Sequence, residues 1–67
     1  ADVHLRQRFA DTSLQTGNYS LPVLEIYLGL AQEDPANRAA YYGKVSAIYT
    51  ALGNEKEALR FRMFSQN

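Results

Sequence analysis

The side chains that most often carry catalysis are few in this sequence and are not grouped. His4 is the only histidine, there is no cysteine, and no carboxylate pair shares a face with His4 at metal-ligand spacing. Because a metal site needs several ligands, His4 is interpreted as structural or incidental. The serines lie in no local motif with a general base, and no glycine-rich phosphate loop occurs. We therefore expect no enzymatic activity, no catalytic residue, no cofactor and no metal site.

The arginines form two pairs that resemble basic clusters, Arg6 with Arg8 and Arg60 with Arg62. Residues two apart on a helix are separated by about 200° of rotation, so each pair is split between opposite faces. This spacing indicates solvated surface rather than a stripe that binds phosphate. Arg60 follows Glu57 by three residues, a spacing that favours a weak ion pair within one helix.

Length and composition limit the classes of function that remain. The chain has 67 residues, 46% of them hydrophobic, eight aromatic side chains and a formal net charge of zero. A chain this short forms one domain at most, residues 1–67, and has little room for a deep reaction pocket. Zero net charge argues against binding to nucleic acid or electrostatic binding to membranes. The absence of cysteine is compatible with both cytoplasm and periplasm, so the compartment stays open, with the cytoplasm slightly favoured.

Membrane insertion is not expected. The longest apolar stretch runs from Val23 to Ala31 and is interrupted by Glu25. It is much shorter than the roughly 20 residues that a membrane-spanning helix needs.

Turn residues divide the chain into four segments of similar length. They fall at Gly17-Asn18, Asp34-Pro35 and Gly53-Asn54. No segment shows the strict alternation of apolar and polar residues that is typical of a half-buried strand. The sequence therefore predicts an all-α fold of four short helices.

Several residues predict where these helices begin and end. Gly17 supplies the left-handed conformation that commonly follows a helix, and Pro22 is suited to the first turn of the next one. Asp34-Pro35 is predicted to cap and open the third helix. Asn54, with Glu57 three residues later, predicts the N-cap of the fourth helix.

The middle two segments predict the packing. Leu21 to Gln32 has apolar residues around almost its whole circumference, so this helix should be covered on more than one side. The third segment has an apolar stripe of helical period, which comprises Tyr42, Val45, Tyr49 and Leu52.

Tyr41 and Tyr42 are adjacent, and therefore about 100° apart on their helix. Both cannot point into the same core, so one of them is expected to face solvent or a partner. Tyrosine is enriched at protein interfaces because it joins apolar area to a polar tip.

The sequence contains an internal repeat. Aligning Gly17-Asn18 on Gly53-Asn54 superposes two helix-turn-helix units 36 residues apart. The alignment pairs residues of similar type, Ala10 with Ser46, Phe9 with Val45, and Val23 with Leu59. Because one such helical hairpin cannot bury its apolar stripe alone, we expect the two units to stack.

The later unit, Ala39 to Met63, resembles a tetratricopeptide repeat. The features that match the family are, in chain order, Tyr42, Val45, Ser46, Tyr49, the Leu52-Gly53-Asn54 turn and Ala58-Leu59. The earlier unit is divergent, with Arg6, Ser13 and Pro22 at positions where the family has an aromatic residue, tyrosine and alanine. The resemblance implies two stacked hairpins, about 1–33 and about 35–67, in a superhelical fragment.

The resemblance also implies where a partner would bind. In such repeats the first helix of each hairpin lines a concave groove. Carried over by position, the candidate partner-binding residues are Gln7, Arg8, Asp11, Leu14, Gly43, Lys44, Ala47 and Thr50, with Tyr41 as a further candidate. Arg8 and Lys44 correspond in the two units and are candidates to hold a peptide carboxylate or an acidic side chain.

These observations favour a non-enzymatic protein–protein interaction module, an adaptor or scaffold whose partner is another protein or peptide. One alternative is a homo-oligomer, in which the apolar second helix packs against its copy. Another is a regulatory or structural part of a larger enzyme or secretion component. A helix-turn-helix DNA-binding domain is disfavoured by the zero net charge and the split arginines.

Overall fold

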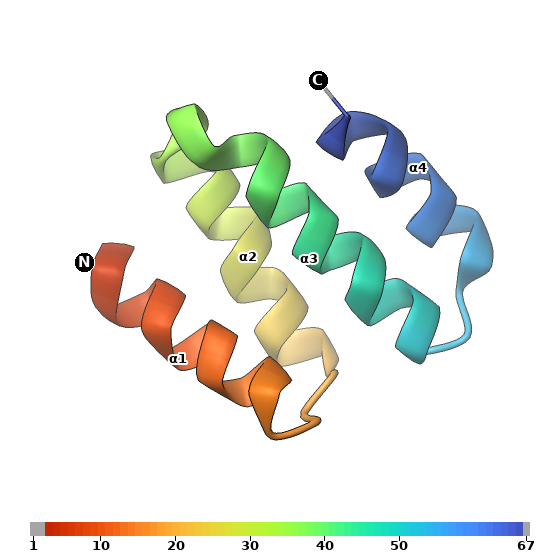
Figure 1. Cartoon of the computed structure of the whole chain (residues 1–67), viewed down its shortest axis with the longest axis horizontal. Helices are drawn as coiled ribbons and strands as arrows, with labels where there is room; N and C mark the ends of the chain where they lie inside the picture. The colour runs from red at the N-terminus through yellow and green to blue at the C-terminus, as the bar shows by residue number, and fades with distance from the viewer. Residues whose placement is uncertain (1–2, 67) are drawn as a thin grey trace.

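The computed structural model describes residues 3–66, which form four α-helices packed in chain order (Figure 1). The helices are α1 (Val3–Gln15), α2 (Leu21–Glu33), α3 (Arg38–Ala51) and α4 (Glu55–Ser65), with a short 3-10 turn, η1 (Pro35–Asn37), before α3. Backbone contacts join α1 to α2, α2 to α3, and α3 to α4. Residues 3–66 contain no strand, so the predicted all-α fold of four helices is confirmed. None of these helices is long and apolar enough to cross a membrane.

Two glycines end the first helix of each hairpin in the same way. Gly17 and Gly53 both have a φ of 83°, the left-handed region that glycine adopts without steric cost. The amide of the next residue then donates to a carbonyl oxygen five residues earlier, Asn18 to Ser13 at 2.8 Å and Asn54 to Tyr49 at 2.9 Å. This is the pattern of a Schellman motif, so both predicted turns are present and have the same hydrogen bonds.

The starts of α2 and α4 also follow the prediction. Pro22 lies in the first turn of α2, where its missing N–H leaves no helical hydrogen bond unmade. The Asn54 side chain caps α4 by accepting a hydrogen bond from the Glu57 amide at 3.3 Å.

The start of the third helix follows the prediction only in part, because Asp34 is at the N-cap position of a 3-10 turn and not of α3 itself. Pro35 opens the turn η1, and α3 begins only at Arg38. The Asp34 side chain makes no capping bond to the backbone. Its carboxylate instead accepts hydrogen bonds from Asn37 Nδ2 at 2.9 Å and from the Tyr41 hydroxyl at 2.8 Å. The carboxylate is therefore engaged by two side-chain donors and not by backbone amides.

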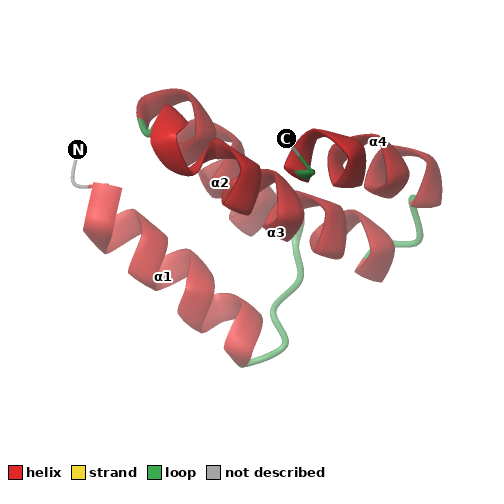
Figure 2. Ribbon diagram, turned by 45° about the horizontal axis from the view of Figure 1, so that its top comes forward, coloured by secondary structure: helices red, strands yellow, loops and turns green. Residues whose placement is uncertain are grey.

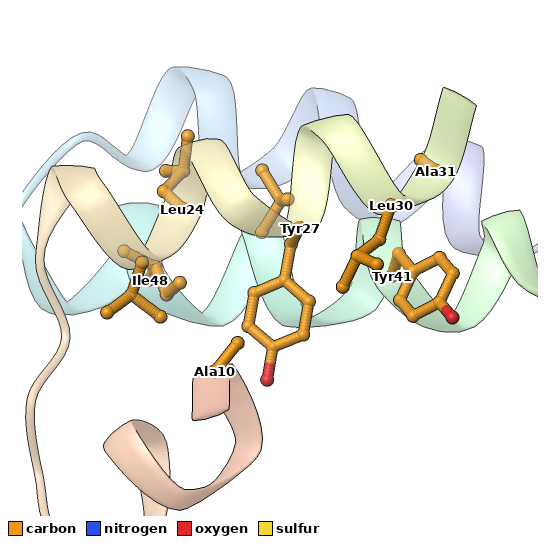
Figure 3. Packing of buried hydrophobic residues seen from close by; sticks show 9 residues of the cluster. Ala10, Leu24, Tyr27, Leu30, Ala31, Tyr41 and Ile48 are labelled. Carbon is orange, nitrogen blue, oxygen red and sulfur yellow. The ribbon is translucent and has the colours of Figure 1, made fainter. Parts of the chain in front are cut away.

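The core lies on both sides of α2, as its all-round apolar pattern predicted. Figure 3 shows Tyr27 of α2 pointing toward Ala10 of α1, with Ile48 and Tyr41 of α3 among the neighbouring core residues. Tyr27 is 1% exposed and Ile48 is fully buried. The other core members are Val23, Leu24, Leu30, Ala31 and Val45. Burial of this apolar area is the main contribution that stabilises a domain of this size.

Tyr41 and Tyr42 point to different sides of α3, as their spacing predicted, and Tyr42 is the one that stays partly open, at the edge of a hollow. Tyr41 is buried, and its ring centroid lies 6.3 Å from that of Tyr27 in α2. Tyr42 is half-buried on the other side of α3, where its ring lies 5.5 Å from Phe61 and 5.7 Å from Phe64. Two adjacent side chains can both be covered because α3 has one helix on each side.

Candidate functional site

A hollow of about 350 Å³ lies between α1 and α3. Figure 1 shows α2 between α1 and α3, and Figure 2 shows α1 set apart from the other helices. The walls come from the second half of α1, the loop that follows it, and the middle of α3. The lining residues are Asp11, Leu14, Gln15, Tyr19, Lys44 and Ala47, which we call the groove.

Four of the candidate residues derived from the sequence line this groove. They are Asp11 and Leu14 from α1 and Lys44 and Ala47 from α3. Sequence reasoning missed Gln15 and Tyr19. Gln15 follows Asp11 by one helical turn, so helical spacing was a sufficient signal for it. Tyr19 comes from the loop before α2, and helical spacing carries no information about the path of a loop.

The remaining candidates do not line the groove. Tyr41 is buried with its hydroxyl on Asp34, so the structure removes it from the surface that a partner can reach. Gly43 faces α4, because a Cβ atom placed there would lie 3.8 Å from Ser65 Cβ. Arg8 is exposed on α1. Gln7 is half-buried and Thr50 is exposed, and neither is among the lining residues.

The α1 wall of the groove is fixed by a hydrogen bond from the core. The Tyr27 hydroxyl donates to Asp11 Oδ1, so a buried ring of α2 holds the carboxylate in place. Burial raises the pKa of Tyr27 above its ordinary value of 10.0, and the hydrogen bond to Asp11 raises it further. The phenol therefore remains a donor at neutral pH. Asp11 is partly exposed and keeps acceptor sites that face the groove.

The α3 wall carries an exposed cation. Lys44 is exposed and forms no ion pair with any residue in the 3–66 range. The ion pairs of the described residues lie elsewhere, between Arg6 and Glu33 and between Arg60 and Glu57. The Arg60–Glu57 pair, at 3.2 Å, is the one that the sequence predicted. The groove thus has an ammonium on one wall, a carboxylate on the other, and apolar surface from Leu14 and Ala47 beside them.

A second hollow of about 350 Å³ lies at the other end of α3. It is lined by Pro35, Ala36, Arg38, Ala39, Tyr42 and Phe64. The rings of Tyr42 and Phe64 belong to an aromatic cluster that also contains Phe61 and joins α3 to α4. This hollow has no carboxylate among its lining residues, so it differs from the groove in charge.

Metal ligands are not grouped in the described residues. Within positions 3–66, no three His, Cys, Asp or Glu side chains lie close enough together to hold a metal ion. The buried polar side chains bond to the backbone instead. Ser13 donates to the Phe9 carbonyl oxygen at 2.9 Å, and Ser46 donates to that of Ala58 at 2.6 Å.

Comparison with known proteins yields no match. No protein-family model matches the sequence, and neither a curated protein nor a solved structure matches the chain. What is shown is therefore a small all-α domain of four helices packed consecutively, without assignment to a family.

Proposed function

We propose that this chain is a non-enzymatic, tetratricopeptide-like interaction module, an adaptor or scaffold that binds a peptide segment of a partner protein. The observation that carries the proposal is the groove between α1 and α3. It brings together Asp11 and Leu14 from one hairpin with Lys44 and Ala47 from the other. These are positions at which the resemblance implied a concave binding face.

Features of the two hairpins support the tetratricopeptide-like assignment. Each first helix ends in the same glycine turn, at Gly17 and at Gly53. Small residues lie where the helices of the second hairpin approach, since Ser46 donates to the backbone of Ala58 and both are buried. Ala10, the counterpart of Ser46 in the repeat, is fully buried as well.

The charges of the groove define the kind of peptide that fits. Lys44 offers an ammonium that forms no ion pair within residues 3–66, which suits an acidic side chain or a terminal carboxylate of the peptide. Asp11, on the opposite wall, accepts peptide N–H groups or a basic side chain. Apolar side chains of the peptide would pack on Leu14, Tyr19 and Ala47. Opposite charges on the two walls would set the orientation of the peptide.

A charge-reversal experiment tests the proposal. The wild-type chain, Lys44→Glu and Lys56→Glu are immobilised in parallel and exposed to extract of the source cell. Lys56 is the matched control, because it is exposed on α4 outside the groove and undergoes the same change in charge. A specific partner should be retained by the wild type and by Lys56→Glu and lost with Lys44→Glu.

Titration calorimetry with a peptide from the retained protein then measures the effect. We expect Lys44→Glu to weaken binding at least about tenfold, the range for loss of a charge-assisted contact. Arg8→Glu tests whether the exposed arginine of α1 assists Lys44. Equal affinity of the Lys44→Glu and Lys56→Glu variants for the peptide would contradict binding in the groove.

A further inference from the structure

The two outermost helices expose apolar side chains at positions that are buried in the inner helices. The first helices of the two hairpins, α1 and α3, align 36 residues apart, so their residues can be compared position by position. Their sides toward the following helix match. Ala10 of α1 and its counterpart Ser46 of α3 are both buried, and Ser46 bonds to the backbone of α4. At this aligned position the two helices therefore have the same burial.

The opposite sides of the same two helices differ in exposure. On α3, Tyr41 and Val45 face back toward the preceding hairpin and are 2% and 0% exposed, with Tyr41 packed near Tyr27 of α2. Their counterparts on α1 are Leu5 and Phe9, which are 61% and 60% exposed. The residues remain large and apolar at both positions. What differs is that α3 has α2 beside it, whereas within the described residues α1 has no helix on this side.

The outer side of α4 is apolar too. Leu59 and Met63 are one helical turn apart and are 55% and 63% exposed. They lie on the far side of α4 from Ala58 and Phe61, which face α3. In the first hairpin the corresponding helix, α2, is covered on its outer side by α3. Figure 1 shows α1 and α4 at opposite edges of the molecule.

We propose that a second copy of this chain packs its α1 onto α4 of the first, with the geometry of the internal α2–α3 contact. The template for the interface is already present inside the molecule, because α2 and α3 join one hairpin to the next in the same way. The outer sides of both α1 and α4 expose large apolar side chains, unlike the polar outer face that is typical of a capping helix in a stack of repeats. Covering these faces removes apolar surface from water.

The two contacting faces are different, so the association is heterologous. Each copy keeps one free α1 face and one free α4 face after pairing, and the stack therefore grows rather than closing as a dimer. The surface is separate from the groove, whose lining residues include none of Phe9, Leu59 and Met63. The inference is therefore independent of the proposed peptide binding.

Sedimentation velocity over a dilution series tests this inference. We use the wild type from about 10 μM to about 1 mM, a range suited to weak association through small faces. Two variants each block one face, Phe9→Lys on α1 and Met63→Lys on α4. Gln32→Lys is the control, because it adds the same charge at an exposed site on an inner helix. Circular dichroism checks that every variant remains helical.

The heterologous arrangement gives a distinctive pattern of results. The average mass of the wild type and of Gln32→Lys should rise beyond that of a dimer, while each face variant alone should associate at least about tenfold more weakly. An equimolar mixture of Phe9→Lys and Met63→Lys should form a 1:1 dimer and nothing larger, because only one complementary pair of faces remains intact.

Four results would overturn the inference. A wild type that is monomeric at every concentration would show that no copy covers these faces. A species that stops at the dimer would indicate a symmetric contact, as would a dimer that persists in one variant alone. A mixture of the two variants that stays monomeric would show that α1 and α4 are not the complementary pair.

Discussion

The hydroxyl of Tyr27 donates a hydrogen bond to the carboxylate of Asp11, and this bond joins the core of the protein to the wall of the groove. The ring of Tyr27 is 1% exposed, whereas Asp11 is partly open to solvent. The position of a groove carboxylate on α1 is therefore set by a core residue of α2. A core substitution that moves Tyr27 should therefore also move the Asp11 carboxylate in the groove.

Removal of this hydroxyl should cost stability without disturbing the packing. Tyr27→Phe keeps the ring and deletes one hydrogen bond to a carboxylate, so we expect the free energy of unfolding to fall by about 1 kcal/mol. Tyr19→Phe is the control, because Tyr19 is 37% exposed at the edge of the groove, and it should change stability by less than about 0.5 kcal/mol. Urea denaturation measures both. Equal losses in the two variants would mean that the Tyr27–Asp11 bond contributes nothing specific.

Alkaline pH should unfold the protein through its buried tyrosines. Burial raises the pKa of Tyr27 and of Tyr41 above the ordinary value of 10.0, and hydrogen bonds to Asp11 and Asp34, respectively, raise them further. Below pH 10 both phenols are neutral in the folded and the unfolded chain, so their full contribution to the free energy of unfolding is present. Above pH 10 the unfolded chain loses these protons first, and stability falls as pH rises.

Ultraviolet absorbance of phenolate and circular dichroism, recorded on the same alkaline titration, check this prediction. Ionisation of Tyr27 and Tyr41 should coincide with loss of helix. The double variant Tyr27→Phe with Tyr41→Phe should lose less stability between about pH 9 and about pH 11 than the wild type does. If the wild type ionises all five tyrosines with its helices intact, the two phenols are not held in the core.

Acidic pH should remove the contribution that the ionised Asp34 carboxylate makes to the stability of the fold. The hydrogen bond from Asn37 lowers the pKa of this carboxyl below its ordinary value of 3.8, and the bond from Tyr41 lowers it further. Because the pKa is lower in the folded chain, the stabilisation is present above pH 3.8 and is lost as pH falls through the folded value. Asp34→Asn does not titrate, so its stability deficit relative to the wild type should shrink between about pH 7 and about pH 3. Thermal melts at the two pH values measure the deficit, and a deficit that stays constant would rule out a role for the ionised carboxylate.

The sequence was sufficient to predict where most of the helices begin and end, but less so to predict which side chains their packing buries. Glycine adopts at no steric cost the left-handed conformation that ends a helix, so the turns at Gly17 and Gly53 could be predicted from residue type. The burial of α3 on two sides depends on its tertiary contacts with α2 and α4. The apolar pattern of α3 alone does not show these contacts. This is why Tyr41 was expected at a surface and is found in the core beside Tyr27.

The same distinction applies to the groove. Asp11 and Lys44 could be placed from helical positions because the two first helices have the same register after alignment. Tyr19 could not, since the loop before α2 follows a path that depends on packing. Asp34 shows a further limit of prediction from sequence. A carboxylate before a proline is a typical N-cap, but the Asp34 side chain accepts hydrogen bonds from Asn37 and Tyr41 instead.

The contact between α3 and α4 depends on a small residue at position 46. Ser46 is 6% exposed, and its hydroxyl donates to the Ala58 carbonyl oxygen at 2.6 Å, which leaves no room for a larger side chain between the helices. Ser46→Ala should cost about 1 kcal/mol for the lost hydrogen bond. Ser46→Leu should cost more, about 1–3 kcal/mol or higher, because it overpacks the contact and forces α4 away.

Ser65→Ala is the control for the Ser46 variants. The Ser65 hydroxyl bonds within its own helix, to the Arg62 carbonyl oxygen, so its loss should cost less than about 0.5 kcal/mol. Guanidinium denaturation of the three variants should rank them with Ser65→Ala most stable and Ser46→Leu least. A Ser46→Leu protein as stable as the wild type would show that α3 and α4 tolerate a wider separation, and the close approach inferred for this hairpin would be wrong.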